Sequence, residues 1–215
     1  MVTSERRILN QLKADAIRTE SLFANAGQTA QERTVVAGLL RVFGVGFDLR
    51  ELVKQGPEPI DVWFRDARFQ VTEVLDSGRR RNAEIKERAD RIKNAQSLKE
   101  LIEPGTIYSR PITPAELVAL AAERATAKAQ KYAGSCGDID LLIYINLQRR
   151  HVYPSGPFPS DLNPAFMAWR SISIIMEGFS IVLWASNDAP GFIVERVGLS
   201  LSWDRLESVF PALDD

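Results

Sequence analysis

Two amphipathic helices are predicted near the amino terminus, because apolar residues recur there every three or four positions. The first helix covers residues 4–24 and ends before Gly27. The second begins near Thr29 and ends at Gly44. Charged residues occupy the positions between the apolar ones, so each helix has one face suited to burial and one suited to water.

Two further helices are predicted in the middle of the chain. The pattern over residues 79–100 is amphipathic, and its polar face is dense in arginine and lysine. The other helix begins at Thr113, because a threonine cap is followed by a proline at the first helical position and by Glu116, which can reach back to the cap. This helix runs to about Tyr132.

Strands are predicted where β-branched and aromatic residues gather between turn signals. These runs cover residues 47–53, 59–64, 69–75, 138–147, 171–176 and 179–185. The run over 138–147 is almost unbroken apolar sequence after its start, as expected for a central strand covered on both faces. The remainder of the chain from Pro190 is ambiguous.

The second and third of these runs form a predicted antiparallel hairpin around a short polar turn. Pairing Arg65 with Arg68 sets its register. Because side chains alternate across a sheet, one face is then apolar and the other is polar. The polar face carries Asp61 opposite Thr72 and Trp63 opposite Gln70.

The composition indicates one α/β domain with additions. The chain has 215 residues, of which 45% are hydrophobic, so it can bury a sizeable core. We expect a single domain over residues 1–215, made of an N-terminal helix (1–27), a core (28–150) and a C-terminal extension (151–215).

Charge and rare residues exclude several classes of function. The 27 basic and 28 acidic residues nearly cancel, so any site for a polyanion must be a local patch. One cysteine, Cys136, and one histidine, His151, argue against thiolate clusters and histidine-based catalysis. The chain has no apolar signal core and no apolar run near the roughly 20 residues that span a bilayer. We therefore expect a soluble, cytoplasmic protein that binds no membrane.

The hairpin and the helix before it resemble the PD-(D/E)XK nuclease superfamily, whose sites use an Asp at the start of one strand and a Glu-x-Lys on the next. The corresponding positions here are Asp61 and Gln70-Val71-Thr72. The resemblance implies an α/β fold of the restriction-endonuclease-like type, with a mixed central sheet flanked by helices, a long N-terminal helix and a C-terminal extension.

A closer resemblance spans most of the chain. It is to a family of uncharacterised bacterial proteins described as "putative endonucleases". The segments that carry it are Glu32-Arg33, Pro59 to Val62, Val74 to Arg80 and Asp140 to Tyr144.

The superfamily resemblance implies a divalent-metal site. Asp61 would hold Mg²⁺ or Mn²⁺, and Glu32 would supply a second carboxylate from the helix. Gln70 replaces the expected carboxylate but still offers a carbonyl oxygen, so we expect weaker metal binding. A C2 homodimer is common among such folds and is compatible with this one.

The same resemblance leaves the catalytic cation missing, because Thr72 replaces the lysine. A neutral hydroxyl neither stabilises the charge of a reacting phosphate nor orients water as a cation does. The candidates for a replacement are Arg79, Arg80 and Lys86, which would also bind phosphates. Lys128 and Lys131 form a second basic cluster that precedes the strand beginning near Asp140.

Each of these residues also has a structural interpretation. Asp61 is in a position to cap a turn, and Glu32 in the first turn of a helix stabilises the helix dipole. The basic helix is typical of a solvated surface held by ion pairs such as Glu84 with Arg88.

Two other groups are alternatives. Asp138 and Asp140 form a possible carboxylate pair at the entrance of a strand, a position that favours loop hydrogen bonding. Four tryptophans are interpreted as core or interface residues rather than as base-stacking residues, namely Trp63, Trp169, Trp184 and Trp203.

Two functions therefore remain. The first is a divalent-metal-dependent phosphodiesterase that acts on DNA, with Asp61, Gln70, Thr72, Arg80 and Lys86 as its candidate catalytic residues. The second is a module that keeps the fold, has lost catalysis and serves in nucleic-acid binding or structure. The missing lysine favours the module, whereas the retained carboxylates favour the enzyme.

Overall fold

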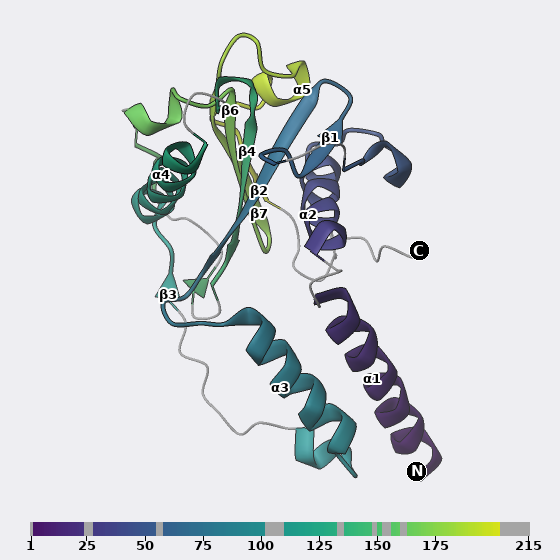
Figure 1. Ribbon diagram of the computed structural model, residues 1–215. Helices are drawn as coiled ribbons and strands as arrows, with labels where there is room; N and C mark the ends of the chain where they lie inside the picture. The colour runs from purple at the N-terminus through teal and green to yellow at the C-terminus, as the bar shows by residue number, and fades with distance from the viewer. Residues whose placement is uncertain are drawn as a thin grey trace. The chain divides into compact units, whose positions relative to one another are not determined.

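The computed structural model describes residues 2–23, 28–54, 58–101, 110–132, 136–147, 150–151, 156–159 and 163–202 (Figure 1). The chain divides into two compact units. The first unit contains Met1–Gln31 and Ser77–Tyr108, and the second contains Glu32–Asp76 and Ser109–Asp215. No helix in the described part of the chain is long and apolar enough to cross a membrane.

The first unit is built on two helices that pack side by side, α1 (Val2–Phe23) and α3 (Arg81–Asn94). Small or aliphatic side chains are buried on the facing sides, including Leu9 and Ala16 of α1 and Ala89 of α3. Both helices were expected from the 3.6-residue spacing of apolar positions, and the structure confirms them.

The helix predicted over residues 79–100 ends earlier than expected. Ala95 adopts an extended conformation, and the 3₁₀ helix η3 (Leu98–Leu101) follows. The side chain of Glu100 accepts hydrogen bonds from the Gln96 backbone N–H at 3.1 Å and from the Ser97 hydroxyl at 2.8 Å. Backbone groups that would have continued α3 are thus bonded locally, which ends the helix.

The second unit contains a six-stranded mixed sheet with the strand order β1-β2-β4-β6-β7-β8. Its strands are β1 (Val62–Phe64), β2 (Ala67–Leu75), β4 (Asp140–Asn146), β6 (Ser171–Met176), β7 (Phe179–Ala185) and β8 (Ser200–Ser202). β2, β4 and β6 are parallel, whereas the β1–β2, β6–β7 and β7–β8 pairs are antiparallel. The prediction of a mixed α/β fold is confirmed.

Helices cover both faces of this sheet (Figure 1). On one face, α4 (Pro114–Lys131) packs Leu117, Ala121 and Ala125 into a core that also contains Leu141 and Ile143 of β4. On the other face, α2 (Gln28–Val42) contributes Val36, Leu39 and Leu40 to a core that contains Phe69 and Leu142. Because successive β4 side chains enter opposite cores, this strand is apolar at nearly every position.

Several short elements complete the described fold. They are η2 (Leu49–Glu51), η4 (Cys136–Asp138), η5 (Pro164–Phe166), α5 (Gly191–Val194) and the two-stranded parallel sheet of β3 (Arg110–Pro111) and β5 (Arg150–His151). The predicted start of α4 is confirmed, because Thr113 and Glu116 form the reciprocal pair of capping hydrogen bonds at 3.2 and 2.9 Å.

The strand predicted over residues 47–53 is wrong. The structure has η2 there, because Asp48 accepts a hydrogen bond from the Arg50 backbone while Glu51 accepts one from the Asp48 backbone. This reciprocal capping stabilises a helical turn in a sequence whose apolar content suggested a strand. Val53 pairs with β1 through an isolated bridge.

Candidate functional site

The hairpin of β1 and β2 forms as predicted, but its register differs by two residues. Val62 pairs with Phe69, and the Asp61 N–H donates to the Phe69 carbonyl at 2.8 Å. Asp61 lies just outside the paired residues, and its side chain contacts that of Gln70. A shift of two residues leaves every side chain on its original face, so the predicted polar face is retained.

The tighter turn explains the shift. Arg65 and Asp66 alone connect the two strands, and Arg65 has a φ of 54°, in the left-handed region. The guanidinium of Arg65 donates to the Gly46 carbonyl at 2.8 Å and to Glu51 at 3.2 Å. These contacts support an unusual backbone conformation that the sequence pattern did not indicate.

Asp61 lies just before β1 and is held by its neighbours across the hairpin. Its carboxylate accepts a hydrogen bond from the side-chain amide of Gln70 and another, at 2.9 Å, from the Val71 backbone N–H. Asp61 is only 6% exposed and Gln70 only 2% exposed. The two residues that the resemblance aligned with a metal site therefore touch each other in a buried position.

The side-chain amide of Gln70 has a buried oxygen atom without a hydrogen-bond partner among the described residues. Its nitrogen donates to the Asp61 carboxylate and, at 3.1 Å, to the Val71 carbonyl. Because both partners are acceptors, the amide orientation is fixed. The Gln70 Oε1 atom is consequently buried without a hydrogen-bond partner among the described residues. Such an atom costs free energy unless it gains a partner.

Glu32 is the second buried carboxylate. It lies near the start of α2 and is 6% exposed, and its Oε2 is 3.6 Å from the Lys54 ammonium. Burial, followed by repulsion from Glu32, raises the pKa of Asp61 to about 6. The Val71 N–H, Lys128 and Lys54 act in the opposite direction.

The raised pKa of Asp61 predicts that its ionised form destabilises the fold. The ordinary value is 3.8 and the folded value is about 6, so the folded state binds the proton more tightly. The unfolding free energy should therefore fall as the pH rises from about 4 to about 6, by about 3 kcal/mol in total. In chelator, Asp61→Asn should be as stable as the wild type at pH 4 and more stable at pH 8. Urea titrations would measure this, and a difference that did not vary with pH would contradict it.

The oxygen atoms at this site fit a hard divalent cation. Two carboxylates and one partnerless amide oxygen are the kinds of ligand that Mg²⁺ accepts while keeping several waters. No group of three or more His, Cys, Asp or Glu side chains suited to a metal occurs in the described parts of the chain. Thr72, on the same face of β2, is half-buried and brings no charge.

Two lysines supply positive charge near Asp61. Lys54 and Lys128 both lower the pKa of its carboxyl group. Lys128 was predicted, but Lys54 was missed, because it directly follows the strand predicted over residues 47–53 and was assigned to a turn. Lys131 is engaged elsewhere, since its ammonium is 2.8 Å from Glu58.

The three predicted cations of the basic segment belong to the first unit, whereas Asp61 belongs to the second. Arg79 pairs with Glu84 at 2.6 Å. Arg80 precedes α3 and Lys86 lies on it, and both side chains are exposed. Their assignment to phosphate binding remains a prediction.

Asp138 and Asp140 do not form a carboxylate pair on one strand. Asp138 lies in η4 and is 3.6 Å from Arg68, whereas Asp140 begins β4 and pairs with Arg170. Asp140 also accepts a hydrogen bond from the Ser171 hydroxyl at 2.7 Å. These contacts are structural, as the position at a strand entrance suggested.

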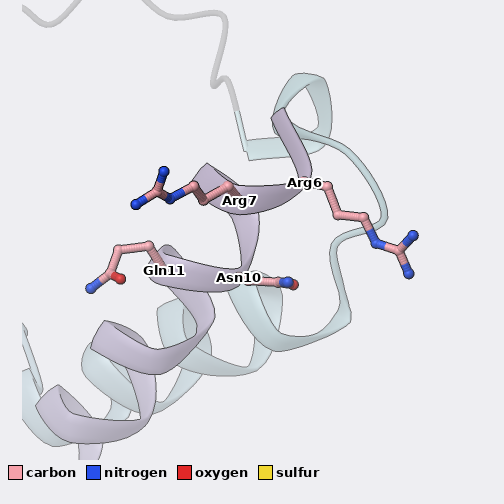
Figure 2. Close-up of a pocket in the computed structure, with 4 residues that line it drawn as sticks. All are labelled: Arg6, Arg7, Asn10 and Gln11. Carbon is pink, nitrogen blue, oxygen red and sulfur yellow. The ribbon is translucent and has the colours of Figure 1, made fainter. Parts of the chain in front are cut away.

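A separate open depression lies on α1 of the first unit. It is lined by Arg6, Arg7, Asn10 and Gln11. Figure 2 shows Arg7 and Gln11 pointing to one side of the helix and Arg6 pointing away from them. These side chains come from one exposed helix and do not converge on a common point, so this depression has no feature of a catalytic site.

The sequence model of one protein family matches residues 4–206. Its description is "Putative endonuclease, protein of unknown function (DUF1780)". The chain belongs to this family. The closer resemblance drawn from the sequence is thus confirmed, whereas membership of the wider PD-(D/E)XK superfamily stays a prediction.

One solved structure is similar over nearly the whole chain. It is a protein of unknown function from Pseudomonas aeruginosa strain PAO1, described as belonging to the monooxygenase superfamily. The TM-score is 0.67 and the sequence identity 26%, and the match covers 95% of this chain and 98% of that one. No curated protein matches the sequence.

Proposed function

We propose that this protein is a divalent-metal-dependent endonuclease of the PD-(D/E)XK type, which hydrolyses phosphodiester bonds in DNA with Mg²⁺ or Mn²⁺. The observation that carries the proposal is the buried set of Glu32, Asp61 and the partnerless Gln70 Oε1. A cation among them would relieve the repulsion that raises the pKa of Asp61 and would give Gln70 Oε1 a partner.

The residues of the site have distinct roles in this proposal. Glu32 and Asp61 bind the cation, and Gln70 is an auxiliary ligand. When bound, the cation polarises a phosphoryl oxygen and lowers the pKa of an attacking water. The Val71 N–H, at 2.9 Å from Asp61, orients that carboxylate.

Lys54 and Lys128 are the cations best placed to replace the missing lysine of the motif. Both are close enough to Asp61 to lower its pKa. Lys54 is paired with the carboxylate of Glu32, whereas Lys128 lies 5.5 Å from the centre of the Tyr132 ring. Either ammonium can contribute positive charge near a phosphate that approaches Asp61.

A catalytically degenerate module is the alternative, and one contact favours it. The Gln70 amide already donates a hydrogen bond to the Asp61 carboxylate. A glutamate at this position could not donate that bond and would coordinate a metal ion instead. In this case the fold would serve in nucleic-acid binding or as a structural module without cleavage.

The family and the similar solved structure carry different descriptions, one an endonuclease and the other a monooxygenase superfamily. The donor set favours the first, because carboxylate and amide oxygens suit Mg²⁺ or Mn²⁺. Purified protein that carried a flavin or haem absorption band would favour the second.

The proposal is tested by incubating purified protein with double-stranded, single-stranded and branched DNA and with RNA. Cleavage of DNA in Mg²⁺ or Mn²⁺, and none in chelator, is expected. The melting temperature should also rise with the cation, since binding to the folded state stabilises it. If the protein shows no cleavage and no thermal response to the cation, the degenerate module is the better account.

Replacement of Gln70 by glutamate should strengthen metal binding by roughly tenfold or more, because it restores a negative charge that a hard cation prefers. The variant should melt at a lower temperature than the wild type in chelator, since a third carboxylate is buried beside Glu32 and Asp61. Added Mg²⁺ should then raise its melting temperature by more than it raises that of the wild type.

The matched control is Gln70→Met, which keeps the size of the side chain and removes the amide oxygen. Its thermal response to Mg²⁺ should be smaller than that of the wild type. Equal metal affinity in all three proteins, measured by calorimetry, would show that residue 70 does not contact the cation.

A further inference from the structure

A row of three side chains crosses the hairpin next to the acidic site. Val53 forms an antiparallel bridge with Trp63, and Trp63 pairs with Arg68 across the hairpin. Paired residues on neighbouring strands place their side chains on the same face of a sheet. Val53, Trp63 and Arg68 therefore form one row. Asp61 lies two residues before Trp63, and Gln70 lies two residues after Arg68.

This row is partly exposed and lies outside the two apolar cores. Val53 is 38% exposed and the Arg68 side chain 37% exposed, while Trp63 is half-buried. Trp63 takes part in neither of the two apolar cores of the second unit. By contrast, Trp169 is fully buried in one of them. Trp169 is therefore a core residue, as one of the two sequence-based interpretations had it, whereas Trp63 lies outside both cores.

Arg68 places its guanidinium over the ring of Trp63. The guanidinium carbon of Arg68 is 5.3 Å from the centre of the Trp63 ring. The Arg68 Nε is buried without a hydrogen-bond partner among the described residues, and one terminal nitrogen is 3.6 Å from Asp138. Planar guanidinium and indole groups are the surfaces on which nucleobases stack.

The position of this surface matches the size of one nucleotide. Trp63 is two residues from Asp61 along the chain, so their Cα atoms are at most about 7 Å apart. A base on the Trp63–Arg68 pair would leave the phosphate of the same nucleotide within reach of the acidic site. Arg68 would also attract the negative backbone, which the carboxylates of Glu32 and Asp61 would otherwise repel.

We propose that Trp63 and Arg68 are a stacking surface for an unpaired nucleobase, so that the site takes single-stranded or unpaired nucleic acid in preference to intact duplex. This inference rests on the proposed function, because it names the substrate of the same site. A paired base in a duplex has its faces covered by its neighbours and cannot stack on this surface.

The experiment measures binding in chelator, where cleavage cannot interfere. Fluorescence anisotropy would compare a single-stranded oligothymidylate with an abasic oligonucleotide of equal length and charge, and with a duplex. The wild type should bind the oligothymidylate most tightly. Trp63→Leu should weaken that binding by about tenfold or more, since stacking on an aromatic side chain contributes about 1–3 kcal/mol per base. Its affinity for the abasic strand should not change.

Two further variants keep the test decisive. Trp63→Phe should recover most of the preference for bases, and Arg68→Met should reduce it, whether or not Trp63→Leu folds well. An equal loss on both oligonucleotides, or no preference in the wild type, would overturn the inference. A change in sedimentation of Trp63→Leu without an effect on bases would instead assign the row to an interface between copies.

The outcomes separate this inference from the proposed function. A preference for bases without metal-dependent cleavage would leave the stacking surface in place on a degenerate module. Cleavage without a preference for bases would leave the endonuclease and remove the stacking surface.

Discussion

Replacement of Asp61 by asparagine is expected to reduce metal-dependent cleavage of DNA by at least about a hundredfold, the scale seen when a preorganised charge-stabilising group is removed. Asp61 is buried and is oriented by the Val71 N–H at 2.9 Å, so the variant loses a carboxylate that is already in place. The thermal response to Mg²⁺ should disappear with it. Cleavage rates and melting curves, each with and without cation, would measure both effects.

Asp66→Asn is the matched control for this variant. Asp66 is exposed in the turn of the same hairpin, and its backbone carbonyl, which substitution retains, is what Arg170 contacts. The control removes the same charge and should keep full activity. If both variants lost activity equally, the effect would come from net charge rather than from a metal ligand at Asp61. Full cleavage activity in Asp61→Asn would remove the proposed site altogether.

The loss of catalysis should coincide with a gain in stability. Repulsion between Asp61 and Glu32 is part of what raises the pKa of Asp61. A site that holds two buried carboxylates without a cation is less stable than a neutral one, a trade-off that is common at functional sites. A change that lowers activity while raising stability is difficult to explain if Asp61 only caps a turn.

Periodicity predicted the elements that rely on the core. α2 and α4 bury one apolar stripe each, and β4 is apolar on both faces, so their sequences have a clear period. β6 and β7 were predicted with the bounds that the structure has. Burial dominates the energetics of these segments, and local hydrogen bonding does not compete with it.

Local hydrogen bonds explain where the prediction was wrong. In residues 47–53, Asp48 and Glu51 cap a helical turn. In the third helix, Glu100 bonds to backbone that would otherwise continue α3. In a hydrophobic pattern these carboxylates look like any other polar residue. Whether they begin or end a helix depends on the local backbone conformation, which the spacing of apolar residues does not indicate.

The candidate site was only partly predictable from the sequence. The sequence predicted that Asp61 and Gln70 lie close together on the hairpin, and the hydrogen bond between their side chains agrees with this despite the register shift of two residues. The proximity of Lys54 to Glu32 could not be predicted in this way, because it depends on the path of η2 and of the chain that follows it. Contacts between segments that are far apart in sequence carry no periodic signal.

The stability of the hairpin depends on a buried ion pair at the start of β4. Asp140 is 1% exposed and binds the Arg170 guanidinium. The same carboxylate accepts the Arg68 N–H at 2.9 Å, and Arg170 also donates to the Asp66 carbonyl at 3.0 Å. These bonds join the β1–β2 hairpin to the centre of the sheet and so hold Asp61 in position.

Replacement of Asp140 by alanine is expected to lower the unfolding free energy by about 3–5 kcal/mol, because it leaves the charge of Arg170 buried without its carboxylate. Arg170→Met should cost a similar amount, because it leaves the Asp140 carboxylate buried without its guanidinium. The double variant Asp140→Ala with Arg170→Met should cost less than the sum of the two single changes, since it removes both charges together. Urea unfolding of the four proteins at pH 7 completes the cycle. Single variants that cost less than about 1 kcal/mol, or costs that simply add, would mean that this pair does not hold the hairpin to the sheet.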